Sequence, residues 1–325
     1  MKREHAFWLL MVFSVVAISF VAVEVFVRIW VDNGMQFDLE MWKYARSLKQ
    51  AAPDPLVDFE HRPNSQAFLM GVDITINSKG LRDNETPYDH TPGVLRVLML
   101  GDSFTEGWGV ALEDTFSKRI ERLYAATGVR AELINAGVGN YNTIMEVNYF
   151  LDEGWKFHPD IIVLNTTFND AEPLPPHSTE NPLLDFCYSC VFIAGRFDTL
   201  MRDTSLRADW KNYYLGLYGD GTTPGWLAAK SVMAQLADYT RAHNEKLLVA
   251  SLPELHELKP YPLQHITDLV HQEADQIGAQ FIDVLPALSD TPPRSLWVSP
   301  GDPHPNAHAN ELIANALFQK LKTMQ

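Results

Sequence analysis

The sequence is poor in cysteine and in positive charge. It holds 2 cysteines in 325 residues, too few for the dense disulfide framework that stabilises small secreted domains. Lysine and arginine together number 26 against 41 acidic residues, and no basic run is present that would neutralise phosphates. We therefore expect no nucleic-acid partner. Hydrophobic residues make up 46% of the chain, enough to predict a folded protein with a sizeable core.

Charged residues are absent from one long segment near the N-terminus. Residues 6–23 consist mostly of Leu, Val, Phe, Met, Ile and Trp, and a run of this length can cross a membrane as a helix. A removable signal peptide would end in a small-x-small cleavage site, which the residues from Phe20 to Glu24 match only weakly. A buried core helix is the other alternative, but Glu24 and Arg28, one turn apart, are typical of a membrane interface. We therefore favour a retained anchor.

The charges around this run predict its orientation. Lys2 and Arg3 precede it, whereas the charged residues after Arg28 are largely acidic, and positive charge normally stays on the cytoplasmic side. Residues 1–30 are therefore expected to form a cytoplasmic tip and a single-pass anchor in the cytoplasmic membrane. The rest of the chain would lie outside, in a periplasmic or other extracytoplasmic space.

The two cysteines lie close together, at Cys187 and Cys190. An exported compartment permits a disulfide between them, and we favour this small local cross-link. Unpaired thiols are the main alternative. A metal site or a redox pair is disfavoured because no second pair of ligands accompanies the two cysteines.

Beyond the anchor, the chain changes character twice. Residues 31–93 are expected to form a linker and an N-terminal extension, in which residues 72–76 alternate like a half-buried strand. From Val94 onward, short apolar runs alternate with helical patterns. The expected strands are 95–100, 131–135, 161–165, 246–251 and 280–284, and the expected helices are 115–126, 143–155, 263–277 and 307–322. This rhythm predicts an α/β domain over residues 94–325, with a parallel sheet covered on both faces.

One long segment, residues 171–225, interrupts this rhythm directly after an expected strand. It is rich in proline and aromatic residues. It would be either an insertion packed on the flank of the domain or a lid over the substrate, and we favour the lid because long ordered insertions are often functional.

The strand ends carry a serine and a histidine that suit acyl-transfer chemistry. Ser103 follows the first expected strand of the domain, and His304 lies on a loop before the last helix. A serine hydroxyl becomes a good nucleophile when a base removes its proton, and Asp302 could orient the histidine and stabilise its charged form. Parallel strands bring such loops to one edge of the sheet.

Two further strand-end loops offer hydrogen-bond donors for a developing oxyanion. Residues 135–143 are rich in glycine and asparagine, and residues 166–170 contain an amide side chain. A backbone N–H from the first loop and an amide from the second would stabilise a tetrahedral intermediate. Either loop alone would be an ordinary turn.

With these four loops in this order, the chain from Val94 to its C-terminus resembles the SGNH/GDSL hydrolase superfamily. The family's serine falls on Ser103, its asparagine on Asn169 and its histidine on His304, and Asp302 would complete the triad. The resemblance implies a flavodoxin-like three-layer α/β/α sandwich, acyl chemistry through a serine, and no metal or other cofactor.

The segment before the domain is similar to that of a membrane-anchored bacterial subgroup of this family. The similarity rests on residues 61–64 (HRPN), residues 77–83 (NSKGLRD) and residues 101–110 (GDSFTEGWGV).

Two of the family's blocks depart from the usual pattern at the expected oxyanion site. The family's second-block glycine aligns with Asn140, and Gly139 lies one residue early, so either backbone N–H could join those of Ser103 and the Asn169 side chain. Thr167 stands where the third block usually has glycine.

The fourth block is also unusual, and its spacing bears on the reaction. Only Pro303 separates Asp302 from His304, a spacing similar to that of periplasmic polysaccharide O-acetyltransferases. We favour a serine esterase or deacylase acting on an exported carbohydrate, cell-wall or lipid ester. The first alternative is an O-acyltransferase with the same triad, working with envelope polysaccharide machinery. The second is a catalytically silent scaffold subunit of such a system.

Four other residues have two interpretations each. Asp102 and Asp170 neighbour the expected site and would either contact substrate or orient the loops. Trp108 and Trp155 are expected to serve packing rather than sugar binding.

Overall fold

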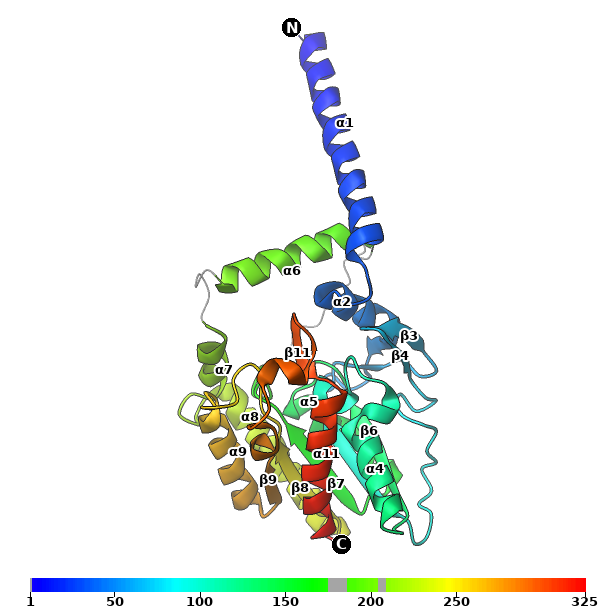
Figure 1. Ribbon diagram of the computed structural model, residues 1–325, viewed down its shortest axis with the longest axis vertical. Coiled ribbons are helices and arrows are strands. Elements are labelled where there is room, and N and C mark those ends of the chain that lie inside the picture. Colours follow the sequence, from blue (N-terminus) through cyan, green and yellow to red (C-terminus); the bar gives the residue numbers. More distant parts are fainter. Residues whose placement is uncertain (1, 175–185, 204–208) are drawn as a thin grey trace.

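The computed structural model describes residues 2–174, 186–203 and 209–325. An α/β domain forms the body of the molecule, and helix α1 (Lys2–Phe26) extends away from it with the N-terminus at its far tip (Figure 1). Helix α6 (Tyr188–Asp203) lies across the space between α1 and the domain (Figure 1). The C-terminus lies at the opposite end of the molecule from the N-terminus.

The domain is built on a five-stranded sheet in which all neighbouring strands are parallel, in the order β6-β5-β7-β8-β9. The strands are β5 (Leu95–Gly101), β6 (Ala131–Gly137), β7 (Ile161–Thr166), β8 (Lys246–Ser251) and β9 (Gln280–Asp283). The strand order reverses between β5 and β7, where ligands bind at the carboxyl ends in sheets of this kind.

Helices cover both faces of the sheet because its strands are apolar on both sides. Val97 and Met99 of β5 pack on one side with α4 and α11, whereas Leu98 and Leu100 pack on the other with α5, α8 and α9. This confirms the predicted three-layer α/β/α sandwich. The covering helices are α4 (Phe116–Ala126), α5 (Thr143–Asp152), α8 (Pro224–His243), α9 (Gln264–Ile277) and α11 (Ala307–Lys322).

Residues before the domain form a small helix and two antiparallel strand pairs. Helix α2 (Phe37–Leu48) packs with the hairpin, and the core between them is closed by Trp108 of the domain. The predicted strand at 72–76 is present as β4. The strands are β1 (Lys49–Ala51), β2 (Phe59–His61), β3 (Gln66–Leu69) and β4 (Val72–Thr75).

The segment around the predicted histidine differs from the expected loop. Residues 302–305 form strand β11 (Asp302–Pro305), which pairs antiparallel with β10 (Trp297–Ser299) outside the main sheet. Two prolines are compatible with a strand here because a two-stranded hairpin leaves its outer edge unpaired. The hairpin gives the histidine a more rigid support than a loop would. Short helices complete the domain: α3 (Ser103–Glu106), α7 (Trp210–Tyr218) and α10 (Leu285–Leu288).

Only part of the expected insertion can be described, because residues 175–185 and 204–208 lie outside the described residues. The rest contains α6 and α7, and a disulfide joins Cys187 to Cys190 at the start of α6. The interpretation of this segment as a lid stays a prediction.

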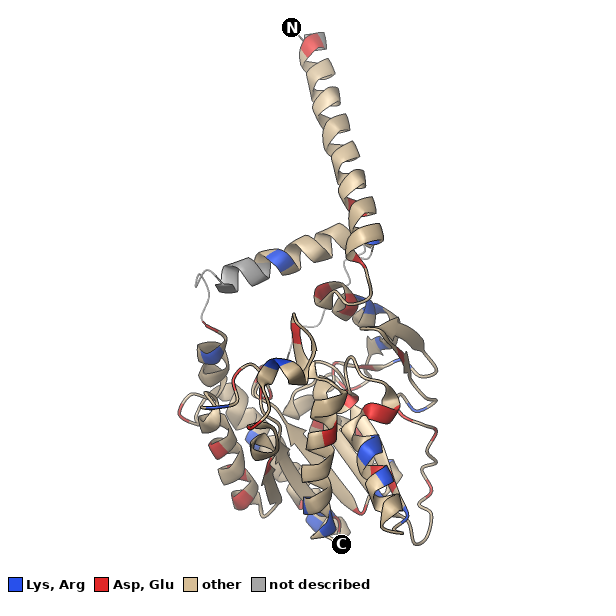
Figure 2. Cartoon of the chain, in the orientation of Figure 1, with Lys and Arg blue, Asp and Glu red and all other residues tan. Residues whose placement is uncertain are grey.

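The apolar run near the N-terminus is a long exposed helix. Within the described part of the chain, residues Glu4–Val31 form one 28-residue helix that is apolar enough to cross a membrane, with only 6% of its most apolar window buried. The structure therefore argues against a core helix. Its central length carries no charged residue (Figure 2).

A glycine at the end of β6 tests how tightly the sheet packs against α3. A Cβ on Gly137 would lie 2.2 Å from the Glu106 backbone nitrogen, so Gly137→Ala should lower the free energy of unfolding by about 1 to 3 kcal/mol. Gly216→Ala is the matched control, because a Cβ there meets nothing within 4 Å. It should change stability by less than about 1 kcal/mol. Thermal unfolding in detergent, followed by circular dichroism, measures both, and equal effects would contradict the prediction.

Candidate active site

The turn after β5 places Ser103 at the reversal point of the sheet. Gly101 has a φ of +156°, and a Cβ there would lie 2.0 Å from the Thr105 hydroxyl, so only glycine fits. Asp102 caps α3 by accepting a 2.8 Å hydrogen bond from the Phe104 N–H. Ser103 therefore begins the helix in a fixed position.

The three predicted triad residues are brought together in a chain of hydrogen bonds. The Ser103 Oγ lies 2.9 Å from the Nε2 of His304, and the His304 Nδ1 lies 2.5 Å from the Oδ1 of Asp302. The same carboxylate oxygen also accepts the His304 backbone N–H at 3.1 Å. This arrangement fixes the imidazole with one nitrogen toward the serine and the other toward the acid.

The environment of the pair favours a charged carboxylate and a basic imidazole. Burial acts to raise the pKa of Asp302, but the charge of His304 and hydrogen bonds from His304 and Trp108 outweigh it and lower the pKa. Burial acts to lower the pKa of His304, but Asp302 and the more distant charges of Asp102 and Glu106 raise it above its ordinary value.

Trp108 has a role at this site that sequence reasoning missed. Its indole Nε1 donates a 2.9 Å hydrogen bond to the Oδ2 of Asp302, and its side chain is almost fully buried. The expectation of a packing residue is therefore incomplete, because the ring also satisfies the second oxygen of a buried carboxylate. Its place five residues after Ser103 gave no signal of this contact, since 194 residues separate it from Asp302.

Phe37 is a second contributor that sequence reasoning missed. Its ring stacks on the His304 imidazole with centroids 5.9 Å apart and meets the Trp108 ring edge-on at 6.4 Å. Phe37 is the first residue of α2, in the segment expected to be a linker. The N-terminal extension therefore covers one side of the histidine.

The hydrogen bonds of Gly139 and Asn140 differ in a way that bears on which of them could bind an oxyanion. The Gly139 N–H is buried and donates to the Tyr44 hydroxyl at 3.0 Å and to the Glu106 carboxylate at 3.1 Å. Asn140 is exposed and has a φ of +69°, a conformation that asparagine tolerates. The geometry therefore favours Asn140 over Gly139 as an oxyanion donor.

Polar residues from the extension hold the loop that carries Gly139 and Asn140. The Tyr44 hydroxyl lies 2.7 Å from the His61 Nε2, and the Lys49 Nζ donates to the Gly139 carbonyl at 2.6 Å and to the Asn140 side chain at 3.1 Å. Burial lowers the pKa of Lys49 to about 7, although nearby Glu106 opposes this shift. The loop conformation thus depends on residues outside the catalytic domain.

Asn169 is oriented by its neighbour Thr167. The Thr167 hydroxyl lies 2.6 Å from the Asn169 Oδ1 and 3.0 Å from the Asp102 Oδ2. With the amide oxygen turned toward Thr167, the NH2 group of Asn169 is the part available to another acceptor. The threonine that replaces the expected glycine therefore connects the third loop to the serine turn.

The two neighbouring aspartates are supporting residues by their positions. Asp102 and Asp170 are both buried, and Asp170 accepts the Thr167 backbone N–H at 2.9 Å. Burial, with repulsion from Asp102, raises the pKa of Asp170 well above its usual range. Of the two interpretations made for these residues, the geometry favours orientation of the loops over contact with substrate.

Comparison with known proteins assigns the chain to a family of the kind that its site residues resemble. The model of the GDSL-like lipase/acylhydrolase family matches residues 99–312. This chain belongs to that family. Family membership places it among the SGNH-type ester hydrolases, and residues 99–312 include Ser103, Asn169, Asp302 and His304. No curated protein matches the sequence closely enough to count as a relative.

Several solved structures are similar to part of this fold. An acetyl xylan esterase is 14% identical, with a TM-score of 0.45, over 70% of this chain and 100% of its own. A psychrotrophic esterase from Pseudoalteromonas sp. is 16% identical, with a TM-score of 0.47, over 70% of this chain and 97% of its own. An alpha/beta hydrolase enzyme from the metagenome of Lake Arreo, Spain, is 15% identical, with a TM-score of 0.48, over 73% and 99%.

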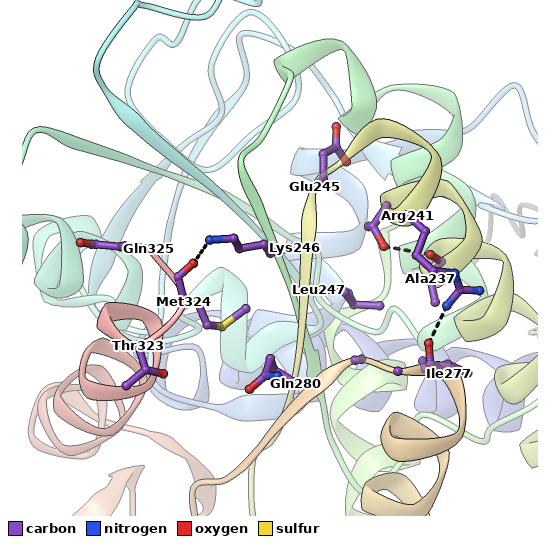
Figure 3. A pocket seen from close by; sticks show the side chains of 13 residues that line it. Ala237, Arg241, Glu245, Lys246, Leu247, Ile277, Gln280, Thr323, Met324 and Gln325 are labelled. Atoms are coloured by element: carbon purple, nitrogen blue, oxygen red, sulfur yellow. Dashed lines mark hydrogen bonds between the residues drawn. The ribbon is translucent and has the colours of Figure 1, made fainter.

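A cavity of about 430 Å³ lies away from this site (Figure 3). It is lined by residues at the start of β8 and by the C-terminal residues, including Lys246, Met324 and Gln325. Lys246 donates there to the Met324 carbonyl. The cavity lies at the amino-terminal end of β8, whereas Ser103 follows the carboxyl end of the parallel strand β5. We therefore assign this cavity no part in the chemistry.

The contact between Trp108 and Asp302 can be tested by a substitution that keeps an aromatic ring but removes the indole N–H. Trp108→Phe leaves one oxygen of a buried carboxylate without its donor, so kcat/KM should fall about tenfold. Trp155→Phe is the matched control, because Trp155 is 38% exposed and its Nε1 donates a hydrogen bond to the nearby Asp152 carbonyl. Steady-state hydrolysis of a soluble ester measures both variants. Unchanged activity in Trp108→Phe would show that the contact has no catalytic effect.

The raised pKa of His304 predicts the pH dependence of the reaction. The base must be neutral to accept the serine proton, so kcat/KM should be lost as the pH falls through the pKa of His304. The inflection should lie above about 6.5, the ordinary value for histidine. Asp302→Asn removes the main charge that raises this pKa and should move the inflection to lower pH. A pH profile whose inflection stays fixed in that variant would contradict this account.

Proposed function

We propose that the protein is a serine esterase or deacylase that works through an acyl-enzyme. The observation that carries this proposal is the continuous hydrogen-bonded chain from Ser103 through His304 to Asp302, closed by Trp108. A silent scaffold would not require a serine hydroxyl 2.9 Å from an imidazole with a raised pKa.

Each step of the reaction uses a group already in position. The Ser103 Oγ attacks the acyl carbon while His304 takes its proton, and Asp302 stabilises the imidazolium that forms. His304 then returns the proton to the leaving alcohol. Water, activated by the same histidine, releases the acid and restores the serine.

The oxyanion is stabilised by three donors in this proposal: the backbone N–H groups of Ser103 and Asn140, and the side-chain amide of Asn169. Removing one such donor typically lowers kcat by a factor of about 100 to 1,000. Tyr44 and Lys49 contribute indirectly, because their hydrogen bonds hold the loop that presents the Asn140 N–H.

We further propose that α1 is retained as a membrane anchor and that the catalytic domain lies on the extracytoplasmic side. The length and exposure of this helix support the anchor, and the positive charges at the N-terminus support the orientation. The substrate would then be an ester on an exported carbohydrate, cell-wall component or lipid. The second candidate is transfer of the acyl group to a sugar hydroxyl, with envelope polysaccharide machinery as partner. The short Asp302-Pro303-His304 spacing supports this candidate.

The acyl-enzyme can be tested with a fluorophosphonate probe, which reacts only with an activated serine. The full-length protein should be labelled, while Ser103→Ala and His304→Ala should not be. A Ser117→Ala variant is the control, since this buried serine is bonded to Thr115 and lies outside the site. Labelling that survives in Ser103→Ala would refute the assignment of the nucleophile.

Hydrolysis and transfer are separated by following the acyl group. With an acetyl ester as donor, release of free acetate without acetylation of an added oligosaccharide supports the esterase. Acetylated oligosaccharide as the main product would replace it with the transferase.

A further inference from the structure

Helix α6 carries an apolar stripe that is largely exposed among the residues that the structure describes. Cys190, Ile193, Ala194 and Phe197 recur at helical spacing, and Ile193 and Phe197 are 57% and 60% exposed. Phe186, just before the helix, is 73% exposed. Residues of this kind in a protein with a net charge of −15 are normally covered by a partner or a membrane.

The stripe continues directly onto the helix that we propose as the anchor. An apolar groove of about 560 Å³ between the two helices is lined by Phe20 and Val23 of α1 and by Ile193 and Phe197 of α6. Lipid must cover Phe20 and Val23 if α1 spans the membrane. The same lipid would reach the α6 side of the groove.

Polar contacts hold α6 against the end of α1. The Glu24 carboxylate accepts the Tyr188 N–H at 3.0 Å and both the N–H and the hydroxyl of Ser189, at 2.8 and 2.7 Å. The Arg28 guanidinium lies 4.1 Å from the centre of the Tyr188 ring. About 20 residues cross the hydrocarbon core, so a span that starts near Ala6 ends near Glu24. The start of α6 is thereby fixed at the level where the membrane ends.

Aromatic and basic side chains gather at the same level. Trp30 stacks on Phe26 with centroids 5.6 Å apart, and Trp42 meets Tyr188 at 4.9 Å. Arg46 lies 5.0 Å from the centre of the Trp42 ring. Tryptophan and tyrosine are enriched where a membrane meets water, and the long arginine side chain is favoured there because its charged end can reach the water.

The other side of α6 is attached to the catalytic domain through α2. Arg196 forms a 2.5 Å ion pair with Asp38, and a Cβ on Gly195 would meet that same carboxylate at 2.3 Å. Asp38 follows Phe37, which stacks on His304. In Figure 1, α6 lies crosswise to α1, above the end of the domain that carries β11.

We propose that α6 lies in the plane of the membrane interface, on the extracytoplasmic side of the membrane that α1 spans. Ile193 and Phe197 would lie among the acyl chains of the bilayer lipids. This inference rests on the proposed anchoring of α1. Lipid acyl chains fill the groove between α1 and α6, and Arg196 of α6 pairs with Asp38 of the N-terminal extension. The helix then holds the domain so that His304 faces the membrane surface, and esters carried at that surface are the substrates within reach.

Covalent geometry separately limits the distance between the membrane and His304. Phe37 lies six residues beyond Val31, where the apolar helix ends, and an extended chain of that length spans at most roughly 20 Å. The helical residues from Glu24 to Val31 add about 10 Å at 1.5 Å per residue. The histidine that Phe37 covers therefore cannot lie far from the membrane in an anchored protein.

The test places single fluorescent labels on the full-length protein in phosphatidylcholine vesicles. Ile193→Cys, Val16→Cys and Trp155→Cys are each labelled with an NBD maleimide without reducing agent, which leaves the Cys187–Cys190 disulfide closed. Vesicles carry a nitroxide either near the head-group end or near the tail of the acyl chain. The label at 193 should be quenched more by the shallow nitroxide, and the label at 16 more by the deep one.

The labels at 16 and 155 separate failure of this inference from failure of the anchor. If the label at 16 is quenched while that at 193 is no more quenched than that at 155, the anchor stands and α6 does not enter the membrane. If none is quenched, the anchor itself is wrong and the inference falls with it.

A second variant tests the stripe without changing the labelled position. Phe197→Glu in the Ile193→Cys protein should reduce shallow quenching to the level at residue 155, because a carboxylate disfavours burial among acyl chains. Leu227→Glu, on an exposed apolar residue of α8, is the matched control and should leave it unchanged. Equal quenching in both variants would overturn the role of the stripe. Hydrolysis of a soluble ester, unaltered in both, would show that the domain is folded.

Discussion

The structure of the site depends on one buried carboxylate, Asp302. Its two oxygens are shared between the His304 imidazole and the Trp108 indole, so neither is left unsatisfied in an interior where that would be costly. Because Trp108 also closes the core of the N-terminal extension, the extension and the triad are packed as one unit. A protein that lost this extension would therefore expose one side of the residues that orient its base.

A second buried network repeats this dependence at the oxyanion loop. Glu106 lies within α3, and its carboxylate accepts the Gly139 N–H while His61 lies 3.7 Å away. Burial acts to raise the pKa of Glu106, but the hydrogen bond and charge of His61 and the charges of Arg82 and Lys49 lower it. His61, Arg82 and Lys49 all come from the extension. The extension thus supplies the positive charge that lets an acid remain ionised beneath the loop.

The sequence predicted the features that leave a local pattern and missed those that arise from packing. Apolar runs such as residues 95–100 predicted the parallel sheet, and the motifs around Ser103 and His304 predicted which strand ends meet. No local pattern marks Phe37, because an aromatic residue in a linker has many roles. The β10-β11 hairpin was missed because Pro303 and Pro305 disfavour a strand. The preference for Asn140 over Gly139 depends on Tyr44, a residue distant in sequence that only the fold brings near.

Two constraints of different kinds bear on where the reaction takes place. One is covalent: the few residues between Val31 and Phe37 limit how far the site can move from an anchored helix, whatever the rest of the chain does. The other is packing: α6 contacts the end of α1 through Glu24 and the N-terminal extension through Asp38. The covalent limit alone allows the domain to rotate about the linker, so it sets a distance and no direction. The contacts of α6 restrict that rotation, and with α6 in the proposed orientation this restriction is what would favour esters at the membrane surface.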